Sequence, residues 1–283
     1  MILCKGSLFV ELSPPGEYYQ ATRFDWAGVF RRIEGNGCIY ADEWFDHYNP
    51  LTHDAVCGPS EEFVTVSFDH VGVGELFVKP GVGLLRRPDV APYDWFRLYE
   101  IADHGKWTVS QAPSKAVFRQ ELGGWYIYEK QIVLTSSSSF SIVHRLQWLN
   151  AMSLQGWSYN HNFFTFNNAP VGPMRTVDFP FQPAGHWREP YPNVGFSARG
   201  IRFTAPVEKG RSVYSGDVCN QLGDTPYSVC VAEDDCRVYI DSPGEKVSRY
   251  VFWANSRVAC VEPYVSVFLN QGQVKSWRID YRL

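Results

Sequence analysis

The stretch that decides the fold is Gly124–Leu149, GWYIYEKQIVLTSSSSFSIVHRLQWL. Two runs rich in Val, Ile, Tyr, Phe and Trp, Gly124–Thr135 and Phe140–Leu149, flank the serines Ser136–Ser139. Apolar and polar residues alternate in both runs, which is the pattern of a strand with one buried face. Because polar residues such as serine favour turns, this stretch predicts two strands joined by a turn.

The same pattern recurs along the chain. We expect further strands at Glu62–Phe68, Arg249–Ala254 and Val258–Leu269, and turns at Glu34–Gly37, Leu122–Gly124, Asn167–Ala169 and Asn270–Gly272. No long segment has apolar residues spaced as on a helix face, so the sequence leaves room for a short helix only, around Ser13–Gln20. Many short strands predict an all-β sandwich or barrel. No change of composition divides residues 1–283, and we expect a single domain.

One segment, Asp178–Ser197, interrupts this pattern. It reads DFPFQPAGHWREPYPNVGFS, and its prolines exclude a central strand. A long irregular segment of this kind is either a lid or binding loop, or a plain surface crossover. If it is a lid, His186, Trp187 and Arg188 are its natural contact residues.

The composition limits the class of protein. Hydrophobic residues make up 45% of the chain and charged residues 20%, which allows a sizeable core. The aromatic fraction of 16% fits both strand propensity and a sugar-binding cleft. The formal charge is −4 and no basic block is present, so we expect no nucleic-acid partner.

The cysteines and the N-terminus bear on the compartment. Seven cysteines form no CxxC pair, which argues against a structural zinc site and fits free thiols used as small core residues in a reducing compartment. The N-terminal MILCKGSLFVELSPPGE reaches Glu11 and a Pro-Pro pair before an adequate apolar region forms, so it does not resemble a signal peptide. No stretch approaches the roughly 18–20 apolar residues of a membrane span. We expect a cytoplasmic protein that does not contact a membrane.

Two N-terminal segments place charged residues in apolar surroundings. In YQATRFDWAGV, Arg23 and Asp25 would share one face of a strand, either as a structural ion pair or as part of a site. PLTHDAVCGPSEEF brings His53, Asp54 and Glu62 near a Gly-Pro turn. Its spacing matches no metal site, and a solvated loop and a binding site both remain open.

Two later segments hold single titratable residues. His161, in YNHNFFTF, is either a core histidine or a proton-transfer residue whose ring the flanking asparagines orient. Glu262, in SRVACVEPYVSV, is a lone carboxylate inside an apolar strand. Its burial would be costly and would raise its pKa, which makes a better base near neutral pH. Trp26, Trp253 and Tyr264 could be a stacking platform or core residues.

Taken together, six segments resemble the galactose mutarotase-like (aldose 1-epimerase) superfamily, in particular a bacterial branch with a TRFDW-type motif. In chain order they are TRFDWAGV, HDAVCGPSEEF, FVKPGVGLLRR, YNHNFF, VEPYVSV and SWRIDY, and they span nearly the whole chain. The resemblance implies a large antiparallel β-supersandwich whose concave face holds a sugar.

The resemblance also implies roles for residues. His161 and Glu262 correspond to the catalytic histidine and glutamate, and Arg23 to an arginine that contacts sugar hydroxyls. His53 resembles a second histidine, although Asp54 stands where glycine is usual. The further substrate-binding residues that we expect are Asp25, Glu62, Asn162 and Trp253. An acidic residue that grips hydroxyls in many relatives could be Asp217, Asp224 or Asp241.

These residue types suit mutarotation, the interconversion of sugar anomers. Glu262 as base would deprotonate the anomeric hydroxyl while His161 as acid protonates the ring oxygen, with no metal and no organic cofactor. The expected protein is an isomerase acting on a small sugar, as a monomer or homodimer. Three alternatives remain. These are a hexose-6-phosphate mutarotase using Arg86, Arg87, Arg175 or Arg188, a non-catalytic carbohydrate-binding or sensing protein, and a polymer lyase or hydrolase.

Overall fold

The computed structural model describes the whole chain, residues 1–283, except for the side chains of Thr65 and Val66. Its regular structure consists of strands and one short 3-10 helix, η1 (Val66–His70). Within the described residues, no helix is long and apolar enough to cross a membrane.

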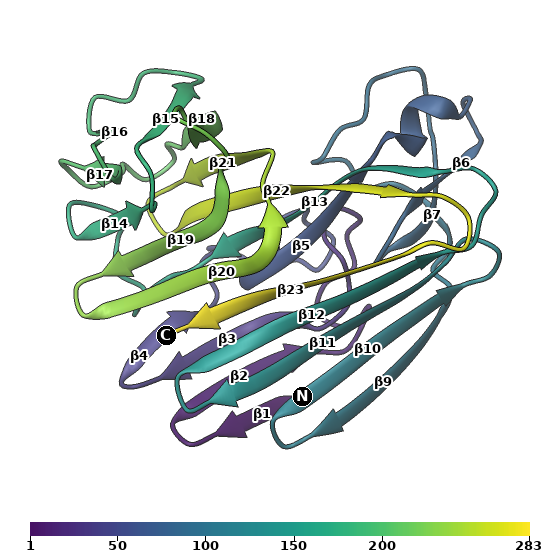
Figure 1. The fold of residues 1–283 in the computed structure, drawn as a ribbon, viewed down its shortest axis with the longest axis horizontal. Coiled ribbons are helices and arrows are strands. Elements are labelled where there is room, and N and C mark those ends of the chain that lie inside the picture. Colours follow the sequence, from purple (N-terminus) through teal and green to yellow (C-terminus); the bar gives the residue numbers. More distant parts are fainter.

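The largest sheet has ten strands (Figure 1). Their spatial order is β16 (Val194–Phe196), β17 (Gly200–Phe203), β14 (Arg175–Asp178), β19 (Pro226–Glu233), β20 (Cys236–Lys246), β23 (Val274–Arg282), β12 (Ser139–Trp148), β11 (Tyr126–Ser136), β10 (Lys115–Leu122) and β9 (Lys106–Ala112). The pairs in this sheet are antiparallel.

The second sheet has six strands and is also antiparallel. Their order is β15 (Pro183–Trp187), β18 (Val213–Asn220), β21 (Arg249–Ala254), β22 (Ala259–Leu269), β13 (Leu154–Phe163) and β5 (Gly58–Thr65). Two smaller sheets complete the fold. One is β1 (Ile2–Lys5), β2 (Leu8–Ser13), β3 (Val29–Gly35) and β4 (Cys38–Ala41), and the other is β6 (Leu76–Lys79), β7 (Gly83–Arg86) and β8 (Ile101–Asp103).

The all-β antiparallel architecture is confirmed, and so is the stretch on which it was predicted. Tyr126 pairs with Trp148 and Leu134 with Phe140 in the β11–β12 hairpin, whose turn lies in the run of serines. Alternate residues of both strands are buried, as the period-2 pattern requires. The other four expected turns lie between strands or at strand ends as well.

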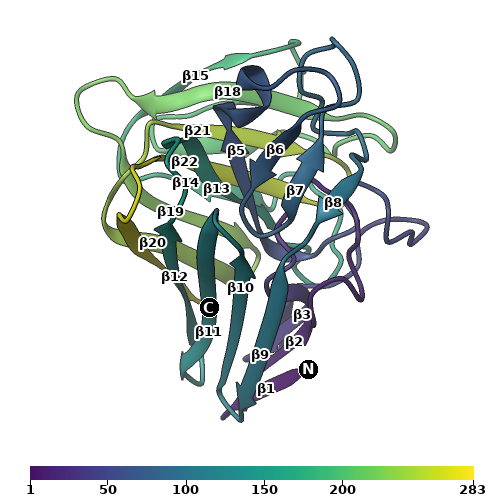
Figure 2. The ribbon, with the colours of Figure 1, turned by 90° about the vertical axis from the view of Figure 1, so that its right-hand side faces the viewer.

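The ten-stranded and six-stranded sheets pack face to face around the main core (Figures 1 and 2). Phe63 of β5 shows the contact between them, because its ring meets Tyr128 at 5.3 Å and Trp277 at 6.1 Å, both on the ten-stranded sheet. The same cluster extends from Leu3 to Tyr281. The opposite face of the six-stranded sheet is covered in part by a second core cluster, which includes Phe24, Trp44 and Phe163, and the rest of that face is free to carry a site.

Two expectations about local structure need correction or refinement. In Ser13–Gln20, Ser13 ends β2 and the residues after it form a turn rather than a helix. Asp178–Ser197 contains two short strands, β15 and β16, which are edge strands of the two large sheets, as a proline-rich segment requires. In Figure 1 the region of β15 and β18 rises at the upper left, opposite the segment around η1 at the upper right.

The sequence suggested that all cysteines are free thiols, and the structure corrects this expectation. Cys38 in β4 and Cys236 in β20 form a disulfide that links residues 198 positions apart. Folding brings their Cα atoms to 6.1 Å, within the usual range for a disulfide, although nothing in their spacing along the chain indicates a pair. Cys4, Cys57, Cys219, Cys230 and Cys260 remain free.

Candidate active site

A pocket of about 560 Å³ opens on the free face of the six-stranded sheet. Aromatic and charged side chains make up most of its wall. The lining residues are Arg23, His53, Asp54, Trp95, Phe96, Tyr159, His161, Phe163, Arg188, Glu189, Ser212, Tyr214, Arg249, Val251, Trp253, Glu262 and Tyr264.

Strand register explains why these residues meet. Tyr159 of β13 pairs with Tyr264 of β22, and Val251 of β21 pairs with Glu262. Because side chains alternate between the faces of a strand, His161 lies on the same face as Tyr159, two residues away. The same register sets His161 beside Glu262 on the adjacent strand. Three neighbouring strands thus contribute one continuous surface.

His161 and Glu262 form the polar centre of the pocket. Nε2 of His161 lies 3.1 Å from Oε1 of Glu262, and both side chains are about 95% buried. The imidazole stacks on Phe163 at a centroid distance of 4.0 Å and meets the edge of Phe24 at 5.9 Å. Among the described residues, Nδ1 has no hydrogen-bond partner. The ring is therefore held by aromatic packing and by a single polar contact to the carboxylate.

Burial sets the protonation of this pair. Desolvation raises the pKa of Glu262 to about 8, with a contribution from the nearby Glu62 carboxylate and against the opposing charge of Arg23. Desolvation lowers the pKa of His161 well below its usual value, and the positive charge of Arg23 adds to this effect, as does that of His53 when it is protonated. Near neutral pH the pair consequently holds one proton, and that proton resides on the carboxyl group.

Arg23 is fixed at the pocket wall by a buried network. Its Nε donates to Glu62 at 3.0 Å and its Nη2 donates to the Tyr159 hydroxyl at 3.2 Å. Glu62 also accepts hydrogen bonds from Lys79 Nζ at 2.7 Å and from the Tyr159 hydroxyl. The Glu62 side chain is completely buried and does not line the pocket. It therefore positions Arg23 rather than contacting a ligand, in contrast to the substrate-binding role expected from the sequence.

Two further expected residues do line the pocket. His53 lies beside Asp54, with 3.5 Å between Nε2 and Oδ2, and packs against Phe96 at 4.7 Å. Burial lowers the pKa of His53, so a neutral ring is favoured near pH 7. Trp253 meets the His161 ring at 5.7 Å in a T-shaped contact.

Asp25 and Asn162 lie outside the pocket, in contrast to expectation. Asp25 is buried between the sheets and accepts hydrogen bonds from Lys130 at 3.2 Å and from Tyr128 at 2.8 Å. Its segment consists of turns, so it makes no ion pair with Arg23 across a strand face. Asn162 donates to the Val261 carbonyl at 2.7 Å on the core side of β13. An adjacent strand residue points to the opposite face, so Asn162 cannot orient the His161 ring.

The remaining residues that the sequence suggested for the site are judged by whether they line the pocket. Trp26 is buried and donates to the Ala21 carbonyl, so it is a core residue, whereas Tyr264 lines the pocket. Asp217, Asp224 and Asp241 do not line it, and the acidic side chains besides Glu262 that do are Asp54 and Glu189. Among the four arginines considered for phosphate, Arg188 lines the pocket, over the Tyr214 ring at 4.1 Å.

Sequence reasoning missed the neighbouring aromatics Trp95 and Phe96 and the polar residues Glu189, Ser212 and Arg249. The cluster YDWFRLY at residues 93–99 was a usable signal, because so many aromatics within one short, turn-rich segment are unusual. Within the described residues, no group of three or more His, Cys, Asp or Glu side chains is placed to hold a metal ion.

Solved structures with this architecture are numerous, whereas no protein-family model and no curated protein matches the sequence. A candidate aldose 1-epimerase from Escherichia coli K12 aligns with a TM-score of 0.61 and 12% identity, over 99% of this chain and 97% of that one. A galactose mutarotase-like protein from Lactobacillus casei aligns with a TM-score of 0.57 and 11% identity, over 100% and 99%. The aldose epimerase homologue from C. elegans gives 0.54 and 9%, over 100% and 97%. The protein therefore has the galactose mutarotase-like fold.

Proposed function

We propose that the protein is a mutarotase of the aldose 1-epimerase type, which interconverts the α and β anomers of a sugar. The observation that carries this proposal is the His161–Glu262 pair, which holds one proton and lies on the floor of an aromatic pocket. Mutarotation needs one group that accepts a proton while another donates one, and a pair with a single mobile proton supplies both.

Ring opening begins when the proton moves from Glu262 to His161 across their 3.1 Å contact. The Glu262 carboxylate then removes the proton from the anomeric hydroxyl. As C1–O1 becomes a carbonyl, the bond from C1 to the ring oxygen breaks, and His161 protonates that oxygen. The pair is left with the proton on Glu262, which is the state that burial favours.

Reclosure reverses these transfers. Rotation about C1–C2 presents the other face of the carbonyl, His161 takes the proton back from the hydroxyl at C5, and Glu262 returns one to O1. No proton is gained or lost over the cycle. Arg23 and His53, both at the pocket wall, steady the oxygen atoms that carry partial charge during these steps.

The test is anomer exchange, followed by polarimetry or NMR over free, acidic and 6-phosphorylated hexoses and deoxyhexoses. We expect acceleration for at least one sugar and a loss of roughly 10²–10⁴-fold in Glu262→Gln, the usual contribution of a general acid–base group. Sugar binding without acceleration across the panel would instead identify a non-catalytic sugar-binding protein.

A phosphorylated sugar is the second candidate substrate, because Arg188 and Arg249 both line the pocket. Both side chains already have partners. Arg188 lies over Tyr214, and Arg249 pairs with Asp217 at 3.0 Å. Glu189 adds a negative charge to the same wall. A free sugar is therefore the better fit, and a marked preference for the 6-phosphate in the panel would reverse this order.

A further inference from the structure

The loop that carries Trp95 and Phe96 is anchored firmly. Tyr93 and Tyr99 stack on one another at 5.3 Å, and Tyr93 packs against Phe68 at 5.5 Å. The Tyr93 hydroxyl accepts a hydrogen bond from Lys79 Nζ at 2.6 Å, and the Tyr99 hydroxyl accepts one from the backbone amide of Asp94 at 2.8 Å. The partly buried Tyr93 ring and the buried Tyr99 ring thus hold the two ends of a short loop.

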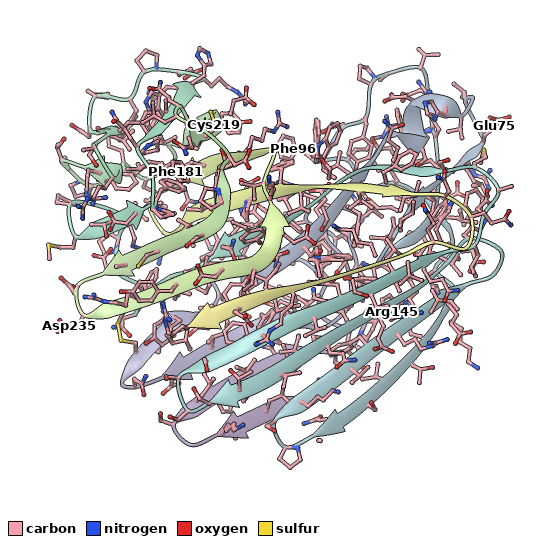
Figure 3. The ribbon with its side chains drawn as sticks, viewed as in Figure 1. Glu75, Phe96, Arg145, Phe181, Cys219 and Asp235 are labelled. Carbon is pink, nitrogen blue, oxygen red and sulfur yellow. A yellow bond between two sulfur atoms is a disulfide. The ribbon has the colours of Figure 1, made fainter. Side chains whose placement is uncertain are left out.

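Trp95 and Phe96 project outward between these anchors. Trp95 is 42% exposed and Phe96 65%, although both line the pocket. Phe96, labelled in Figure 3, lies 4.7 Å from the His53 ring and 5.7 Å from the Arg23 guanidinium. An anchored loop that keeps two large aromatic rings partly in solvent loses the stabilisation that their burial would give, and exposed apolar surface of this kind is common at binding sites.

We propose that Trp95 and Phe96 form a subsite for a second sugar ring, so that the substrate is a disaccharide or longer oligosaccharide whose reducing end mutarotates. This inference rests on the proposed function. The chemistry at His161 and Glu262 involves a single ring and does not need these aromatics. The second ring must be joined through an oxygen other than O1, because mutarotation requires a free anomeric hydroxyl.

The chemistry of the subsite suits a sugar ring. A pyranose has an apolar face of C–H groups that packs on an aromatic ring, and hydroxyls at its edge. His53, Asp54 and Arg23 lie along the same wall as Phe96 and can meet such hydroxyls. Small-molecule sites usually consist of a few polar groups placed among aromatic and apolar side chains. The subsite is continuous with the catalytic floor within one pocket of about 560 Å³, a volume within the usual range of small-molecule sites.

The experiment compares anomer exchange for glucose with that for maltose, cellobiose and isomaltose, and for galactose with that for 4-galactobiose. We expect kcat/KM to be higher for at least one disaccharide than for its own monosaccharide. Trp95→Ala and Phe96→Ala should each lower the ratio of the two kcat/KM values by roughly 3- to 10-fold. The matched control is Leu98→Ala, which removes an exposed apolar residue of the same loop that does not line the pocket and should leave the ratio unchanged.

The outcomes separate the two claims. Exchange of the monosaccharides with no advantage for any disaccharide, or equal effects of Trp95→Ala on both, overturns the subsite and leaves the mutarotase intact. No exchange of any of these sugars overturns the subsite, whereas the mutarotase is overturned only when the wider panel of acidic, phosphorylated and deoxy sugars also shows no exchange. Self-association that Phe96→Ala abolishes, seen by sedimentation without a change in the kcat/KM ratio, would show that the aromatic pair instead binds a second copy of the chain.

Discussion

Nε2 of His161 and Oε1 of Glu262 lie 3.1 Å apart on adjacent strands, beneath an aromatic pocket. Cross-strand register rather than a loop fixes this distance, because both residues belong to the six-stranded sheet. Groups on strands are held more precisely than groups on loops. The pair can therefore exchange a proton without any backbone movement.

Burial of Glu262 should reduce stability as the pH rises. Its pKa is about 8 in the folded protein against a usual 4.5, so between these values the folded chain holds a proton that the unfolded chain releases. The free energy of unfolding then declines with pH over this range. Because a glutamine side chain does not titrate, the variant Glu262→Gln should gain stability relative to wild type, by a few kcal/mol at pH 8 and little at pH 4.

Urea unfolding of both proteins between pH 4 and pH 9 measures this difference. His161 is present in both chains, so its own titration largely cancels. Parallel stability curves would mean that the pKa of Glu262 is not raised by folding.

Tyr159 should act by positioning Arg23. Its hydroxyl accepts from Arg23 and donates to Glu62, while its ring stacks on Tyr264 at 4.3 Å. Tyr159→Phe keeps the stacking and removes both hydrogen bonds. Since hydrogen bonds to charged groups contribute about 1.5–3 kcal/mol to stability, we expect a lower melting temperature, and because Arg23 also loses its fixed position, we expect kcat/KM to fall about 10-fold or more.

Measuring kcat and KM separately, beside the melting temperature, tests this role. A purely structural residue would lower stability and leave kcat and KM unchanged. Tyr227→Phe is the matched control. Tyr227 is buried, does not line the pocket, and has a hydroxyl without a hydrogen-bond partner among the described residues.

Lys130 should be a major determinant of stability. Its Nζ lies 3.2 Å from Asp25 and 4.0 Å from Glu61, with all three side chains buried between the sheets. Lys130→Met leaves both carboxylates without this cation, and breaking a buried ion pair costs about 3–5 kcal/mol. Denaturant unfolding measures the loss, and the double variant Asp25→Asn with Lys130→Met should recover part of it. A loss under about 1 kcal/mol, well short of that range, would show that the cluster contributes little.

The disulfide should stabilise the fold without affecting catalysis. It closes a loop of 198 residues, for which the chain-entropy treatment gives about 5 kcal/mol. Cys38→Ser should therefore lower the melting temperature under non-reducing conditions and leave kcat/KM unchanged, because neither cysteine lines the pocket. Thiol titration of the unfolded wild type should count five free thiols. A count equal to all seven cysteines of the chain would show that the bond does not form.

The sequence predicted the architecture well because period-2 alternation directly reports a strand with one buried face. It also singled out His161 and Glu262, since an isolated titratable residue in an apolar strand is costly unless it has a role, and the structure places the two side chains 3.1 Å apart. Their catalytic role stays a prediction. The resemblance in six ordered segments indicated the fold, which the solved structures bear out.

The failures have physical causes. Asn162 was assigned to the site by its nearness in sequence to His161, although strand geometry directs adjacent residues to opposite faces. Asp25 was paired with Arg23 on the assumption of a strand where the chain turns. The disulfide and the exposure of Phe96 depend on packing between distant segments, which no local pattern reports.

The measurement that tests the account most directly is the pH dependence of kcat/KM for anomer exchange, in wild type and in Glu262→Gln. Activity requires the one-proton state of the pair. With the pKa of Glu262 at about 8 and that of His161 well below 6.5, kcat/KM should be level through neutral pH and fall above about pH 8. Glu262→Gln should be nearly inactive throughout. A rate that rises through pH 8, or a glutamine variant with wild-type activity, would contradict the assignment of His161 and Glu262 as the catalytic pair.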